Sequence, residues 1–88
     1  MRIALDYDGT YTYNPGFWDD FINSCRSKKV ELVCVTMRYD KVEERIDIGI
    51  PVYYTGRKAK SPYMVGLGIP IDIWIDDMPF FIERDAIL

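Results

Sequence analysis

The sequence predicts one α/β domain in which helices cover both faces of a small parallel sheet of about four strands. Short apolar runs of strand length alternate with helix-like segments at least three times along the 88 residues. That alternation is typical of parallel strands joined by right-handed crossovers. The run 30–35 is almost continuously apolar, as in a strand that is covered on both faces. The expected architecture is therefore three-layer α/β/α, in a single domain over residues 1–88.

Composition narrows the class of protein. Hydrophobic residues make up 49% of the chain, as in a compact globule, and the net charge of −3 gives no general signal for polyanion binding. We find no secretory signal and no apolar run long enough to cross a bilayer, so we expect a cytoplasmic protein without membrane contact. Histidine is absent, which removes Ser-His-Asp, Cys-His and His-metal mechanisms. Cys25 and Cys34 are expected to be reduced core residues.

The first half of the chain predicts a strand, a helix and a second strand. An apolar run ends at Leu5. Asn14 and Pro15 begin a helix, because asparagine accepts hydrogen bonds from free amides and proline at the first position has no amide to leave unpaired. Apolar residues at three- and four-residue spacing continue that helix to about Lys28. The β-branched run 30–35 is the second strand.

The middle of the chain predicts a short helix followed by an edge strand. Residues 39–47 are highly charged, and Val42 and Ile46 have the spacing of inner helical positions. Residues 50–54 are strand-like. Pro51 places that strand at an edge of the sheet or delays its start, since proline has no amide to donate.

The last third predicts a helix, a strand and a short tail. Ser61 and Pro62 have the residue types of a helix cap and first helical position. Residues 69–75 form an apolar run that we interpret as the fourth strand. Residues 78–82 are expected to turn and to cover one end of the sheet with a short apolar segment.

Polar side chains follow three of the four expected strands. They are Asp6 and Asp8 after the first, Thr36 after the second, and Asp76 and Asp77 after the fourth. The carboxyl ends of parallel strands lie at one edge of a sheet, where open α/β folds bind ligands, and Lys60 would enter at the same rim. Clustered carboxylates need a counter-charge, and ligand sets made only of oxygen suit Mg²⁺, which also binds phosphate.

This arrangement predicts phosphoryl transfer. Asp6 would attack a phosphate ester to form an aspartyl-phosphate that water resolves, while Asp8 would protonate the leaving oxygen and later deprotonate that water. Thr36 would donate a hydrogen bond to a phosphate oxygen, and Lys60 would pair with Asp6 and hold the phosphoryl group. The alternative for both acidic pairs is that they are turn residues only.

Four motifs in this order resemble the signatures of the haloacid dehalogenase-like (HAD) superfamily. Asp6-Tyr7-Asp8-Gly9-Thr10 after an apolar strand resembles the first, and Thr36 after a strand resembles the second. A lysine ahead of the last strand resembles the third, and Ile73-Trp74-Ile75-Asp76-Asp77 resembles the fourth. The resemblance covers residues 2–77 and implies a Rossmann-like HAD-like fold.

The resemblance implies a magnesium-dependent phosphatase with its nucleophile at Asp6 and its acid/base at Asp8. It implies that Mg²⁺ is held by Asp6, by the backbone carbonyl of Asp8, and by Asp76 or Asp77. The residues expected to contact the substrate are Gly9, Thr10, Thr36, Arg38 and Lys60. Lys58 is an alternative to Lys60, which we favour because it lies nearer the start of a helix, where amides also attract an anion.

The chain departs from most members of the superfamily by leaving no room for a cap domain, because residues 11–13 alone separate the first motif from the first helix. Cap-less members often act on bulky phosphate esters. Arg38 resembles an arginine of polynucleotide-end phosphatases, so the substrate class ranges from small phosphate esters to nucleic-acid ends. The charges of Arg57 and Lys58 are expected to be solvated. In size and motifs the chain is similar to small hydrolases carried by bacterial viruses.

Two other functions share these residue types. A phospho-accepting receiver domain also uses acidic residues, a hydroxyl and a lysine around Mg²⁺, but receivers carry their acidic pair on the first strand, whereas Asp76 and Asp77 come last here. A non-catalytic domain could keep the fold and bind a partner. The sequence makes no prediction about the oligomeric state.

Overall fold

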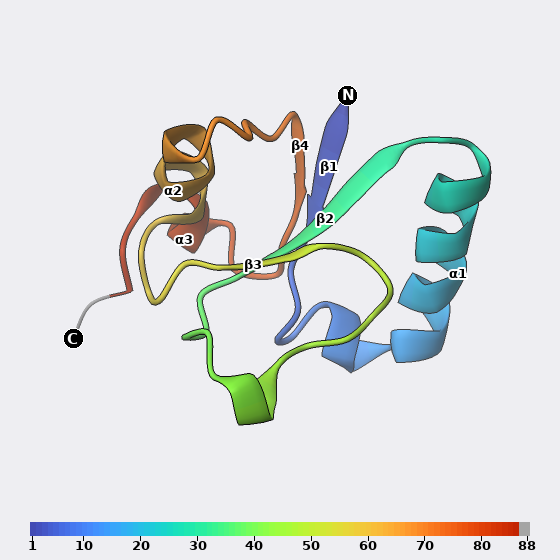
Figure 1. The fold of residues 1–88 in the computed structure, drawn as a ribbon, viewed down its shortest axis with the longest axis horizontal. Helices are drawn as coiled ribbons and strands as arrows, with labels where there is room; N and C mark the ends of the chain where they lie inside the picture. Colours follow the sequence, from blue (N-terminus) through green and yellow to red (C-terminus); the bar gives the residue numbers. More distant parts are fainter. Residues whose placement is uncertain (87–88) are drawn as a thin grey trace.

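The computed structural model describes residues 1–86 and contains one four-stranded sheet in which every strand pairs in parallel, as expected for a small Rossmann-like α/β fold (Figure 1). The strand order is β3-β2-β1-β4, so β1 and β2 are the central strands. In chain order the elements are β1 (Arg2–Leu5), the 3-10 turn η1 (Tyr11–Tyr13), α1 (Pro15–Ser27), β2 (Glu31–Thr36), the 3-10 turn η2 (Val42–Glu44), β3 (Val52–Tyr54), α2 (Lys60–Gly66), β4 (Ile73–Ile75) and α3 (Phe80–Glu83).

Helix α1 covers one face of the two central strands. Its start is confirmed, because the side-chain oxygen of Asn14 accepts a hydrogen bond from the Phe17 amide at 3.4 Å and Pro15 is the first helical residue. The buried residues of this core cluster are Ile3, Leu5, Ile22, Cys25 and Leu32. Cys25 and Cys34 are both buried and free, as expected.

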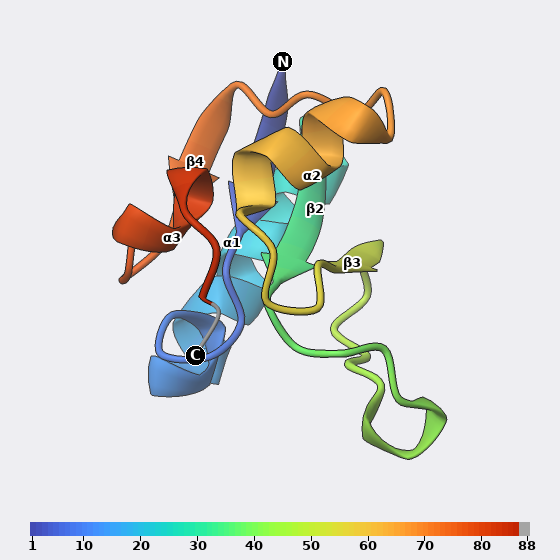
Figure 2. The same ribbon diagram turned by 90° about the vertical axis from the view of Figure 1, so that its left-hand side faces the viewer.

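Helix α2 packs its Met64 against the residues of β1 and β2 that alternate with the first set. This second cluster contains Ala4, Val33, Val35 and Met64. Because successive side chains of a strand point to opposite faces, the central strands are covered from two directions, and Figure 2 shows α1 behind the sheet and α2 in front of it. Among the described residues no helix has the length and apolarity needed to cross a bilayer.

The prediction of a helix over residues 39–47 was wrong. Only the short turn η2 forms there, and Val42 is 76% exposed instead of facing the core. Arg45 pairs with Asp40 at 3.0 Å, a five-residue separation, whereas helical neighbours are three or four residues apart. The Tyr54 hydroxyl accepts a hydrogen bond from the Ile46 amide at 2.7 Å, which fixes the segment to β3.

Strand β3 begins after Pro51 and lies at an edge of the sheet, so both readings of that proline are confirmed. The fourth strand is shorter than predicted, because pairing with β1 starts only at Ile73. Proline lacks the amide that a ladder needs, and the Pro70 carbonyl instead accepts a hydrogen bond from the Arg2 guanidinium at 2.7 Å.

Helix α2 begins at Lys60, one residue before the predicted cap. Ser61 is therefore its second residue. The amide of Ala59, just before the helix, donates to the Asp85 carboxylate at 2.6 Å. A cap supplied from 26 residues away replaces the local serine cap, and no local sequence pattern reports it.

Candidate functional site

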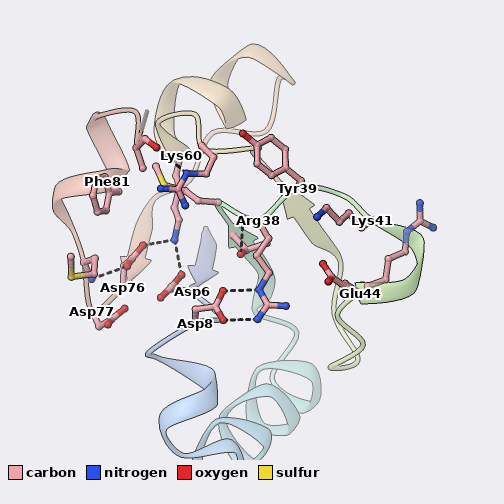
Figure 3. Close-up of a pocket in the computed structure, with 16 residues that line it drawn as sticks. Asp6, Asp8, Arg38, Tyr39, Lys41, Glu44, Lys60, Asp76, Asp77 and Phe81 are labelled. Atoms are coloured by element: carbon pink, nitrogen blue, oxygen red, sulfur yellow. Dashed lines mark hydrogen bonds and ion pairs between the residues drawn. The ribbon is translucent and has the colours of Figure 1, made fainter. Parts of the chain in front are cut away.

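The candidate site lies at the carboxyl edge of β1 and β4. The amide of Asp6 donates to the Ile75 carbonyl at 2.9 Å, so the two strands stay paired to the point where each delivers its aspartate. Asp6 and Asp76 therefore emerge side by side although they are 70 positions apart (Figure 3). The parallel sheet brings the two acidic motifs together.

Lys60 lies between these two carboxylates. Its ammonium group donates to Asp6 at 2.7 Å and to Asp76 at 2.6 Å, and the residue is 3% exposed. Its place at the first turn of α2 carries the side chain from the helix to the sheet edge. Lys58, the alternative, is exposed and lies outside this cleft.

Thr10 connects the first motif to the last. Its hydroxyl lies 3.0 Å from the Asp6 carboxylate and 3.2 Å from that of Asp77, and it accepts a hydrogen bond from the Asp77 amide at 3.1 Å. A hydroxyl has one proton to donate, so it binds one of the two carboxylates at a time. Thr10 thus orients the carboxylates of Asp6 and Asp77. The sequence predicted that Thr10 contacts the substrate, whereas in the structure it contacts other residues of the protein.

Gly9 allows this close approach. Its φ is +84°, a conformation that side chains disfavour, and a Cβ atom at this position would lie 2.3 Å from an oxygen of Asp77. The turn after Asp8 can approach Asp77 only because residue 9 has no side chain.

Burial and charge act in opposite directions on the central pair. Burial raises the pKa of Asp6 from 3.8 to about 6, although Lys60 lowers it in part. Burial would lower the pKa of Lys60, yet its hydrogen bonds with Asp6 and Asp76 raise it above the ordinary value. Lys60 is therefore charged at neutral pH, and Asp6 is mostly ionised at pH 7.

The residues fit a hard divalent cation. One oxygen from each of Asp6, Asp76 and Asp77 lies within 4.8 Å of the others. These three carboxylates outnumber the single positive charge of Lys60 by two, and oxygen-only ligand sets are those that Mg²⁺ prefers. For Asp8 the predicted ligand is the backbone carbonyl, and its side chain is not among these three.

Arg38 binds the carboxylate of Asp8. Its guanidinium donates to both oxygens, from Nε at 2.8 Å and from Nη2 at 2.7 Å, in the two-pronged geometry that arginine favours. The same guanidinium lies 5.1 Å from the centre of the Tyr7 ring. The sequence predicted Arg38 as a substrate ligand, whereas in the structure it fixes the predicted acid/base.

Thr36 is buried at the end of β2, where its hydroxyl accepts a hydrogen bond from the Arg38 amide at 3.3 Å. It lies on the cleft wall, as do Asp6, Asp8, Arg38 and Lys60. Every buried side-chain nitrogen and oxygen of residues 1–86 has a hydrogen-bond partner. The buried part of the site is therefore a hydrogen-bonded polar network.

A cleft of about 740 Å³ opens from this network, a volume within the range of small-molecule sites. Sequence reasoning did not assign several of its lining residues to the site, namely Tyr39, Lys41, Glu44, Arg45, Phe81 and Ala86. Arg57, expected to be solvated, also lines the cleft, and its Nε donates to the Ala86 carbonyl at 2.9 Å. These residues lie on the segment between β2 and β3 and at or after α3, where contacts with distant residues set the position of the chain, so no sequence signal marked them.

Comparison with protein-family models, with curated proteins and with solved structures finds no match to this chain. The relation to the HAD-like superfamily therefore rests on the four sequence motifs and stays a prediction. The convergence of those motifs at one edge of the sheet is a property of the structure itself.

Proposed function

We propose that this protein is a magnesium-dependent phosphatase of the HAD type that hydrolyses a phosphate monoester through an aspartyl-phosphate at Asp6. The observation that carries the proposal is the convergence of Asp6, Asp76 and Asp77 with the buried Lys60. The proposal includes the finer description of the fold as a cap-less, three-layer α/β/α HAD-like domain. The open cleft is consistent with a site that needs no second domain to complete it.

Mg²⁺ would be held by the carboxylates of Asp6, Asp76 and Asp77. When bound, it would reduce the repulsion between an anionic nucleophile and an anionic phosphate. The three carboxylates and the ammonium group of Lys60 together carry a net charge of −2, which the two positive charges of Mg²⁺ would balance. The raised pKa of Asp6 reflects a carboxylate that burial destabilises, and a nearby cation favours the ionised form.

Asp6 is oriented to act as the nucleophile. One of its oxygens binds Lys60 and the other binds Thr10, so the carboxylate cannot rotate freely. In the first step an oxygen of Asp6 bonds to phosphorus, the ester P–O bond breaks, and the leaving oxygen takes a proton from Asp8. In the second step water attacks phosphorus, Asp8 takes the proton, and the carboxylate of Asp6 and inorganic phosphate are released.

Asp8 has the exposure to solvent that these two roles need. Its side chain is 54% exposed at the mouth of the cleft, and Arg38 binds both of its carboxylate oxygens. The ionised carboxylate is the form that removes a proton from water in the second step. The first step requires the protonated acid, which exchanges with solvent at this exposed position.

The test is hydrolysis of an aryl phosphate by the full chain, with Mg²⁺ and with a chelator. We expect phosphate release only with Mg²⁺, and we expect Asp6→Asn to abolish it while Asp20→Asn, an exposed carboxylate of α1 outside the cleft, has no effect. Turnover that survives Asp6→Asn would remove Asp6 as the nucleophile. A stable phosphoprotein without turnover would favour the phospho-accepting alternative. If neither free phosphate nor a phosphoprotein forms, a non-catalytic domain is favoured.

A further inference from the structure

The segment 37–48 forms one wall of the cleft instead of packing on the sheet as a helix. It extends from the carboxyl end of β2 and returns to β3 (Figures 1 and 2), and Ile48 at its end packs against the core cluster under α1. Tyr39 is 58% exposed on this wall. In Figure 3, Tyr39 and Lys41 lie across the cleft from Asp76 and Phe81. Because more than half of Tyr39 is exposed, burial of apolar surface does not explain its place on this wall.

The ring of Tyr39 packs against the backbone of a neighbouring loop. It packs against Gly56, where a Cβ atom would lie 3.3 Å from two of the ring carbons. The Gly56 amide donates to the Arg38 carbonyl at 3.2 Å, which fixes the two loops to each other. The ring therefore has a backbone beneath it, and the half-exposed side chain lines the cleft. This geometry suits a platform for stacking a planar group.

Two cations share the cleft with this ring. Lys41 and Arg57 both line it, and within residues 1–86 neither forms an ion pair. Arg57 is fixed in place, because its amide donates to the Met37 carbonyl at 2.8 Å and its Nε to the Ala86 carbonyl at 2.9 Å. Its backbone has a φ of +73°, which such contacts must support in a residue with a side chain. The cleft therefore has an acidic inner end. The rest of its lining includes the ring of Tyr39, three cations and one carboxylate, namely Lys41, Arg45, Arg57 and Glu44.

We infer that the leaving group of the substrate carries a planar aromatic ring and a second anionic group, as in a nucleotide that bears a further phosphate. The ring stacks on Tyr39, and the second anion lies by Lys41 and Arg57, while the reacting phosphate lies at Asp6 and Lys60. The inference rests on the proposed phosphatase function and adds its substrate class. A cleft of about 740 Å³ is far larger than a phosphate group needs and has the size of sites that enclose whole small molecules.

The first test compares kcat/KM for adenosine 3′,5′-bisphosphate with that for glycerol phosphate. Because a base stacks favourably on an aromatic side chain, Tyr39→Ala should lower the preference for the nucleotide by about five- to 150-fold. Tyr39→Phe should keep the preference, because it keeps the ring. Tyr13→Ala is the matched control, since Tyr13 is 87% exposed and lies outside the cleft. An unchanged preference in Tyr39→Ala would overturn the inference.

The second test concerns the additional anion. Lys41→Ala should lower kcat/KM for the bisphosphate relative to adenosine 5′-monophosphate by about two- to fivefold, the size of an exposed ion pair. Lys58→Ala removes an exposed lysine outside this cleft and should leave the ratio unchanged. Equal effects of the two variants would contradict a role for Lys41.

A binding measurement separates failure of this inference from failure of the proposed function. We expect the Asp6→Asn protein to bind adenosine 3′,5′-bisphosphate in a calorimetric titration, and we expect the added Tyr39→Ala change to weaken that binding about tenfold. Binding without hydrolysis by the unaltered protein would support this inference and reject the phosphatase. Hydrolysis of aryl phosphate without nucleotide binding would support the phosphatase and reject this inference. A phosphorylated oligonucleotide that binds more tightly than the free bisphosphate would assign the site to nucleic-acid ends, and the opposite order to small molecules.

Discussion

Replacing Lys60 with methionine should destabilise the protein strongly when no divalent cation is present. The substitution keeps the apolar stem but leaves Asp6 and Asp76 facing each other without a counter-charge, and the Asp76 side chain is only 3% exposed. Removing one partner of a buried ion pair costs about 3–5 kcal/mol. A chain of this length has a total unfolding free energy of about 4–13 kcal/mol. The variant therefore loses a large part of its stability.

Thermal and urea denaturation in the presence of a chelator measure this loss. For a domain of this size a loss of 3 kcal/mol corresponds to a fall in Tm of roughly 12–24 °C. Lys58→Met, a change at an exposed position two residues earlier, should stay within about 0.5 kcal/mol of the parent. If Lys60→Met lost less than about 1 kcal/mol, the buried ion pairs would not have the energetic role that their geometry suggests.

Mg²⁺ provides a further check on the same variant. Without Lys60 the three carboxylates have no internal cation, so added Mg²⁺ should raise the Tm of Lys60→Met more than that of the parent protein. A cation at ten times its Kd stabilises the folded state by about 1.4 kcal/mol. Equal shifts in the two proteins would place the cation away from this cluster.

Two further substitutions test the site. Burial holds the pKa of Asp6 at about 6, above its ordinary 3.8. The folded state therefore binds this proton more tightly than the unfolded chain, and this carboxyl makes the metal-free protein less stable as pH rises from about 4 to about 6. Asp6→Asn should flatten that part of the Tm profile, and superimposable profiles would contradict the burial argument. Gly9→Ala should cost about 1–2 kcal/mol from its positive φ alone and should weaken Mg²⁺ binding by displacing Asp77, as seen in urea melts and metal titrations. Gly66→Ala, with nothing within 4 Å, is the control.

The inner site could be predicted because it depends on strand order and little else. Asp6, Asp76 and Asp77 each follow a strand, and parallel strands bring their carboxyl ends to one edge. Lys60 reaches the same point because α2 begins with it. Local signals were also sufficient for the start of α1, where the Asn14 cap lies beside the helix that it stabilises.

The outer cleft could not be predicted, because its parts are held by contacts between distant residues. The ion pair of Arg38 with Asp8 joins exposed side chains 30 positions apart, and the Asp85 cap joins the tail to α2. For residues 39–47 the apolar spacing favoured a helix, but short isolated helices are marginal in water. Nothing in the core packs against Val42 to stabilise one.

The two outer strands of the sheet, β3 and β4, are each only three residues long. An open sheet edge exposes unpaired amides and carbonyls that can recruit a strand from another molecule, and long flat edges are common starting points for aggregation. Pro51 precedes β3 and Pro70 lies shortly before β4, and proline is disfavoured inside a strand. The shortness of both edge strands thus limits edge-to-edge association between copies of the protein at the high concentrations used for structural work.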